Sequence, residues 1–319
     1  MNYQEQLLIE IRKKIQPTDS INEVLAAILN ISYDAAHRRV SQKSKFTIDE
    51  TMQLANHFNI SIDNIFGDSK KVVVEKTNEI KNLKDMMNYF KDAANRIEKI
   101  ADDSTTLYYS AKDIPLFYFM DGTIMSKFKL YVWLQLLNPD LSQTEFEKFV
   151  INEAFMEDIQ KLKKMYQKAT VKEVWNDTTI NSSLQQIIYF YEASLVSFES
   201  ANALLKDLKR IVSDLKNKAN KANSNYSIYY NELILLNNNM LIETSSQITM
   251  FVPYTLLGYF ITEDKNSCKS ALDFFNQQIT NSKPLNQSGI KDLNLFFNKM
   301  ERKIDFYTAQ LQKEIDFFY

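Results

Sequence analysis

The chain is poor in the residues that usually mark tight turns, disulfides and catalytic centres. Its 319 residues include four glycines, five prolines, two histidines and one cysteine. The single cysteine, Cys268, excludes an internal disulfide and any zinc cluster built on cysteines. Few glycines and prolines argue against the many tight turns that connect antiparallel strands. Because apolar residues also recur at helical spacing, the sequence predicts an all-α protein.

Long hydrophobic segments are missing as well. The longest apolar run covers residues 250–261 and contains Pro253 and Gly258. A membrane-spanning helix needs about 20 apolar residues, so this run is too short to cross a bilayer. The first residues also lack the pattern of a signal peptide. We therefore expect a cytoplasmic protein that does not enter the membrane.

Histidine and cysteine are too scarce for the common catalytic arrangements. The two histidines, His37 and His57, both lie in the first fifth of the chain. The usual pairs of nucleophile and base therefore cannot be assembled from the rest of the sequence. No glycine-rich phosphate-binding loop is present either. We expect no enzymatic activity, no cofactor and no bound metal.

Charge is balanced over the whole chain but not locally. The formal net charge is −2, so indiscriminate coating of nucleic acid is not expected. Between residues 32 and 46, four cations stand against one anion, which leaves a local charge of +3. A small positive patch on an acidic protein favours selective binding of nucleic acid. The cations are Arg38, Arg39, Lys43 and Lys45, and the anion is Asp34.

Helix start and stop signals are densest around this patch. Capping boxes at Ser20–Glu23 and Thr47–Glu50 each predict the start of a helix. The first of these helices is expected to end near Asn30, which tolerates the positive φ of a sharp turn. Ser32 can then cap a short basic helix. In the helix after Thr47, Ile48 and Met52 are expected to face the core.

These segments resemble the helix-turn-helix domain of Cro- and phage-repressor-type (XRE) transcriptional regulators. The likeness lies in the run Val24–Ser32, the basic helix after it, and the segment Thr47–Phe66, and it covers about residues 5–67. It implies that the basic helix reads the major groove of DNA. By the family pattern, base edges would be contacted by Tyr33, Asp34, Ala35, His37 and Arg38, and phosphates by Arg39, Lys43, Lys45 and Thr47. Ser32 belongs to the same set, at the start of the helix.

A connecting helix follows, within a segment of residues 68–101 that we assign to linker and dimerisation. Its apolar positions alternate at spacings of three and four, which is typical of a coiled-coil seam. The seam residues are Ile80, Leu83, Met87, Phe90 and Ile97, continued by alanines. Two interpretations remain open. The helix pairs with a second copy, or it is an ordinary amphipathic helix packed on its own chain.

The remainder, residues 102–319, is expected to be an all-helical regulatory and dimerisation domain. An aromatic, non-helical segment at 108–119 either packs in the core or lines a pocket. The helices beyond it predict an antiparallel array, with tetratricopeptide-like hairpins as one candidate arrangement. They cover 127–137, the stretch from the capping box at 142–145 to about 168, 183–217, 228–261 as one or two helices, 267–279 and 290–318.

The sequence thus predicts a sequence-specific, DNA-binding transcriptional regulator that acts as a homodimer. Its partners would be double-stranded DNA, a second copy, and a small uncharged or peptide-like effector as a candidate signal. The alternative is a helical interaction scaffold whose helix-turn-helix-like domain docks protein instead of DNA. Salt-dependent binding to duplex DNA separates the two, because only the regulator requires it.

Overall fold

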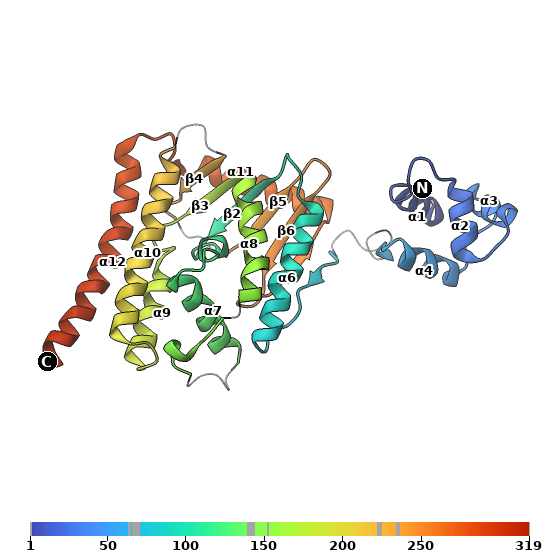
Figure 1. Cartoon of the computed structure of the whole chain (residues 1–319). Helices are drawn as coiled ribbons and strands as arrows, with labels where there is room; N and C mark the ends of the chain where they lie inside the picture. The colour runs from blue at the N-terminus through green and yellow to red at the C-terminus, as the bar shows by residue number, and fades with distance from the viewer. Residues whose placement is uncertain are drawn as a thin grey trace. The chain divides into compact units, whose positions relative to one another are not determined.

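The computed structural model describes residues 2–62, 65, 71–138, 144–151, 153–221, 225–233 and 237–318. The chain forms two compact units, Met1–Val74 and Glu75–Tyr319. The first, unit 1, is helical, and the second, unit 2, combines a large sheet with helices (Figure 1). Within these described ranges, no helix has the length and apolar character that crossing a membrane requires.

Unit 1 is built around one small hydrophobic core. Its helices are α1 (Tyr3–Arg12), α2 (Ile21–Leu29), α3 (Tyr33–Val40) and α4 (Ile48–His57). The buried members of the core are Leu7, Leu8, Ile11, Leu25, Leu29, Ala36 and Leu54. The expected order of helices is therefore present in this unit.

Two local expectations in unit 1 are wrong. Ser20 precedes α2 in an extended conformation, but its side chain makes no capping hydrogen bond. Ile48 and Met52 on α4 are 82% and 47% exposed. The buried residues of α4, Leu54 and Ala55, lie in its C-terminal half, whereas Ile48 and Met52 lie in its N-terminal half, which the core does not cover.

Unit 2 contradicts the all-α prediction, because an eight-stranded mixed sheet runs through it. The strand order across the sheet is β1-β7-β6-β5-β2-β3-β4-β8. The strands are β1 (Glu75–Lys76), β2 (Thr106–Ala111), β3 (Thr170–Trp175), β4 (Tyr226–Tyr230), β5 (Met240–Glu243), β6 (Ile248–Pro253), β7 (Tyr259–Thr262) and β8 (Lys283–Pro284). The helices are α6 (Leu83–Ile100), α7 (Ile124–Leu137), α8 (Glu153–Lys168), α9 (Asn181–Glu192), α10 (Phe198–Ala219), α11 (Lys265–Thr280) and α12 (Ile290–Phe318), with short 3-10 helices η1 (Leu116–Phe119) and η3 (Phe146–Lys148).

The centre of the sheet is parallel and its flanks are antiparallel. β2 pairs in parallel with β3, and β3 with β4. Parallel neighbours need long crossover connections, and here α7 and α8 lie between β2 and β3 while α9 and α10 lie between β3 and β4. β5, β6 and β7 extend the sheet from β2 as antiparallel neighbours.

Helices cover both faces of the sheet. Alternate residues of a strand point to opposite faces, and in β2 Leu107 and Tyr109 enter the main core while Tyr108 joins a second cluster. In that second cluster Tyr108 packs with Leu241 of β5 and Phe275 of α11. α11 therefore covers one face, and the main core with the other helices lies on the opposite face (Figure 1).

The segment 228–261 shows why the helical prediction fails. It was expected to hold one or two helices, but it contains β4 from Ile228 onward and then β5, β6 and β7. A short apolar run suits a buried strand as well as a buried helix. The β5–β6 turn uses neither glycine nor proline, since the Thr244 amide closes it by donating to the Gln247 carbonyl at 2.9 Å. The expected tetratricopeptide-like array is accordingly absent from the described part of unit 2.

α6 belongs to the core of unit 2. Phe90 and Ile97 are at most 5% exposed, Leu83 and Met87 pack against the same cluster, and Ile80, which precedes the helix, is 7% exposed. The helix lies against α8 (Figure 1). Of the two interpretations of this seam, the structure agrees with an amphipathic helix packed on its own chain.

Candidate nucleic-acid interface

The turn between α2 and α3 has the geometry that the sequence predicts. Asn30 takes a left-handed conformation, with φ 52° and ψ 48°, at the end of α2. The next amide, that of Ile31, donates to the Ala26 carbonyl at 3.1 Å. Ser32 then caps α3 by accepting a hydrogen bond from the Ala35 amide at 3.3 Å. Since Ala36 is fully buried, α3 can approach α2 closely.

The outer face of α3 carries Tyr33, Asp34, His37 and Arg38, all exposed, whereas Ala35 is half-buried. Asn22 of α2 holds two members of this face. Its side-chain amide donates to the Tyr33 hydroxyl at 3.2 Å and lies 3.5 Å from His37 Nδ1. The face is therefore accessible and partly preorganised by α2.

Arg39 differs from its neighbours, because its guanidinium is used inside unit 1. Nε and Nη2 donate to the two carboxylate oxygens of Glu50, at 3.0 and 2.7 Å, and Nη1 donates to the Ala35 carbonyl at 3.1 Å. Glu50 also closes the confirmed capping box with Thr47. The ion pair thus joins α3 to the start of α4. Arg39 was expected to hold a phosphate, which stays a prediction, but its present contacts are structural.

Gln4 of α1 supports the segment after α3. Its amide nitrogen donates to the carbonyls of Arg39 and Ser44, at 2.7 and 2.9 Å. Its amide oxygen accepts from the Phe46 amide at 3.2 Å, and the side chain is 8% exposed. One buried side chain thus satisfies three backbone groups, one in the last turn of α3 and two in the segment between α3 and α4. This role of Gln4 could not be predicted from the sequence, because its partners lie 35 to 42 residues away.

Three exposed cations remain around α3 without an ion pair among the described residues. They are Arg38 on α3, and Lys43 and Lys45 in the segment between α3 and α4 that Gln4 contacts. With Asp34 the only exposed anion on α3 and this segment, the local charge that remains is +2. Thr47, also expected at a phosphate, is exposed beside them. The structure thus brings all ten predicted residues onto α3 and the loop to α4.

Comparison of the chain with protein-family models, with curated proteins and with solved structures finds no match. DNA binding by unit 1 is therefore proposed from its geometry. The helix-turn-helix arrangement provides an exposed basic helix, held at both ends by side chains from α1, α2 and α4.

The Arg39–Glu50 pair predicts that unit 1 is sensitive to acid. Burial opposes ionisation of Glu50, but hydrogen bonds from Arg39 and Thr47 outweigh it and lower the pKa of this carboxyl below 4.5. A lowered pKa means that the stabilisation is fully present above the ordinary pKa and is lost as the pH falls through the folded value. We expect Glu50→Gln to cost about 1–2 kcal/mol at neutral pH, and this loss to shrink as the pH falls below 4.5.

Hydrogen exchange in the full chain measures this effect, because amides of α3 and α4 report on unit 1 alone. Glu10→Gln is the matched control, since Glu10 pairs with Lys13 on the surface of α1 and surface pairs contribute little. Equal protection of α3 and α4 in Glu50→Gln and Glu10→Gln at neutral pH would contradict a stabilising role for the pair.

Proposed function

We propose that unit 1 binds double-stranded DNA with α3 in the major groove, and that the chain is a cytoplasmic transcriptional regulator. The proposal rests on the different surroundings of neighbouring side chains on α3. Arg39 is held by Glu50, while Tyr33, His37 and Arg38 stand on the exposed face. A recognition helix needs such a face for base edges, with cations beside it for phosphates.

A second candidate function, docking of a protein, is favoured by the exposed surface of α4. Ile48 and Met52 leave an apolar surface on α4, 82% and 47% exposed. Exposed apolar residues that lie together favour a protein contact. This supports the alternative in which the helix-turn-helix docks protein. The two functions predict different responses to salt, because neutralised phosphates release counterions and apolar contacts do not.

We further propose that the regulator is a homodimer, since one domain of this kind makes few base contacts and two half-sites are the usual remedy. The α6 seam is occupied within its own chain, so the proposed pairing uses another surface. Light scattering of the full chain measures the mass directly. A monomer at concentrations that saturate DNA would overturn this part of the proposal.

The direct test begins with selection of bound fragments from a random duplex library by the full chain. The affinity for a selected duplex is then measured from low to high salt. We expect the logarithm of the association constant to fall linearly with the logarithm of the salt concentration. Selection of no sequence, together with salt-independent capture of protein by the α4 surface, would favour the scaffold.

Arg38 is the residue on which DNA affinity should depend most clearly. Arg38→Ala is expected to weaken binding of the selected duplex by about 1–3 kcal/mol, roughly five- to 150-fold, because one base-reading side chain is lost. Unit 1 should remain folded, since Arg38 is exposed. Arg39 is left intact because its removal would also break the pair with Glu50.

The matched control is Arg12→Ala, which removes an exposed arginine from the last turn of α1. It changes the net charge of unit 1 by the same amount, so any general electrostatic effect appears in both variants. Gel-shift titrations should show a loss for Arg38→Ala well beyond that of Arg12→Ala. Equal affinities of the two variants would remove α3 from the interface.

A further inference from the structure

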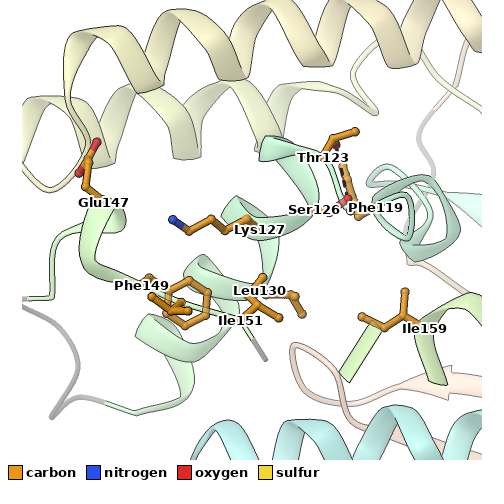
Figure 2. Close-up of a pocket in the computed structure, with 11 residues that line it drawn as sticks. Phe119, Thr123, Ser126, Lys127, Leu130, Glu147, Phe149, Ile151 and Ile159 are labelled. Carbon is orange, nitrogen blue, oxygen red and sulfur yellow. Dashed lines mark hydrogen bonds between the residues drawn. The ribbon is translucent and has the colours of Figure 1, made fainter. Parts of the chain in front are cut away.

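Unit 2 carries a cavity of about 380 Å³ beside the first turns of α7 (Figure 2). η1, the segment after η3, and α8 form its other walls. This volume lies in the range of small-molecule sites, which are mostly apolar with a few polar groups. Its apolar lining is Phe119, Leu130, Phe149, Val150, Ile151 and Ile159, and its polar lining includes Thr123, Ser126, Lys127 and Glu147.

Two of the polar groups already have partners. The hydroxyls of Thr123 and Ser126 both donate to Asp121 Oδ1, at 2.9 and 2.7 Å. The other oxygen of Asp121 accepts from Arg210 at 2.7 Å. These hydroxyls are consequently committed to the network that holds the start of α7, and they offer a ligand acceptor lone pairs but no free proton.

Glu147 is engaged in the same way. It accepts a hydrogen bond from the Ser197 amide at 3.0 Å and one from the Ser200 hydroxyl. Burial opposes its ionisation, but these bonds lower the pKa of the Glu147 carboxyl below its ordinary value. In Figure 2 its oxygens point away from the end of the Lys127 side chain. A cationic group on a ligand would therefore find this carboxylate already occupied at the N-terminus of α10.

Lys127 is the polar group that remains available. Its side chain is half-buried, and Nζ lies 4.5 Å from the centre of the Phe146 ring. Among the side chains that the structure describes, which leave out those of residues 152–156, no carboxylate lies within ion-pairing distance of it. A partly desolvated ammonium on the wall of an apolar cavity attracts an anion more strongly than one in bulk water. A carboxylate can satisfy it with a charge-assisted hydrogen bond.

We propose that this cavity binds a small monocarboxylate with a short apolar tail. The carboxylate pairs with Lys127, and the tail lies against Leu130, Phe149 and Ile159. The lone cation in the wall favours an anion over the uncharged effector expected from the sequence. The proposal concerns unit 2 alone and stands whether or not unit 1 binds DNA.

Octanoate is a suitable probe, with octanol as the comparison that keeps the tail and removes the charge. Calorimetric titration of the full chain, without DNA, should show saturable binding of octanoate, and octanol should bind about tenfold more weakly or not at all. Lys127→Met keeps the apolar stem and removes the charge. It is expected to lower octanoate affinity about tenfold or more, and to leave octanol affinity unchanged.

The matched control is Lys148→Met. Lys148 lies on η3 near the cavity but pairs with Glu145 and does not line the wall. Octanoate affinity should stay at the wild-type value in this variant. The proposal is overturned if octanoate fails to saturate the wild-type protein up to its solubility limit, if octanol binds as tightly as octanoate, or if Lys127→Met and Lys148→Met behave alike. The comparison of octanoate with octanol needs no variant, so it decides the question even if a variant folds poorly.

Discussion

Glu173→Ala is expected to destabilise the protein by about 3–5 kcal/mol, because it removes the acceptor from a buried cluster of donors. Glu173 lies on β3 and is fully buried. One oxygen accepts from the Tyr166 hydroxyl at 2.6 Å. The other accepts from Trp175 Nε1 at 2.7 Å and from the hydroxyls of Tyr226 and Tyr118 at 2.8 and 2.9 Å.

The three tyrosine hydroxyls of this cluster keep their protons at neutral pH and can donate hydrogen bonds. Burial first, and the Glu173 carboxylate second, raise the pKa of Tyr118, Tyr166 and Tyr226 well above 10. The ammonium of Lys218 lies 3.9 Å from the centre of the Tyr226 ring and balances part of the carboxylate charge. Without the carboxylate, the tyrosines can satisfy only part of their hydrogen bonding among themselves, through the contacts of the Tyr118 hydroxyl with those of Tyr166 and Tyr226 at 3.0 and 3.1 Å.

Denaturant unfolding followed by tryptophan fluorescence measures this loss, since Trp175 belongs to the cluster. Glu173→Gln should cost less, about 2 kcal/mol, because it keeps the volume but turns a donor toward other donors. Glu243→Gln is the control, as Glu243 is half-buried and accepts a single hydrogen bond from Tyr108 at 2.9 Å. A Glu173→Ala protein as stable as Glu243→Gln would refute the assignment of this cluster to the stability of unit 2.

Unit 1 could be predicted from sequence because its signals are local. The left-handed Asn30, the Ser32 cap and the Thr47–Glu50 capping box each involve residues at most four positions apart. Short-range hydrogen bonds of this kind compete directly for the backbone, so they leave a clear pattern. The position of Arg39 could not be predicted, because its pairing with Glu50 depends on how α3 packs against α4.

The sheet of unit 2 could not be predicted, because segments that are far apart in the sequence form it. β2 pairs with β3 more than 60 residues later and with β5 more than 130 residues later. Residues 183–217 were predicted as one helix, but Ser194 with φ 58° separates α9 from α10. Ser, Asn and Thr thus supply turns that a search for glycine and proline overlooks. The Glu173 cluster could not be predicted either, since Tyr118 and Tyr226 lie more than 50 residues from Glu173 in the sequence.

Leu83→Glu combined with Phe90→Glu is expected to unfold unit 2, not to separate two folded subunits. Phe90 is 1% exposed, and Leu83 packs against the same core beside α8. Placing a carboxylate at Phe90 removes a buried ring and introduces a charge without a partner, at a cost above about 5 kcal/mol. Most domains have a total stability of only about 5–15 kcal/mol, so little or none would remain.

Circular dichroism and light scattering of the double variant distinguish the two outcomes. If the core is disrupted, we expect the cooperative unfolding transition to be lost and the protein to aggregate through its exposed apolar surface. An α6 coiled coil between copies predicts a folded monomer with native ellipticity. Lys91→Glu is the matched control, because Lys91 is exposed on the same helix and a surface substitution there should change stability by less than about 0.5 kcal/mol. A folded, monomeric double variant would mean that α6 leaves the core and pairs between subunits in solution.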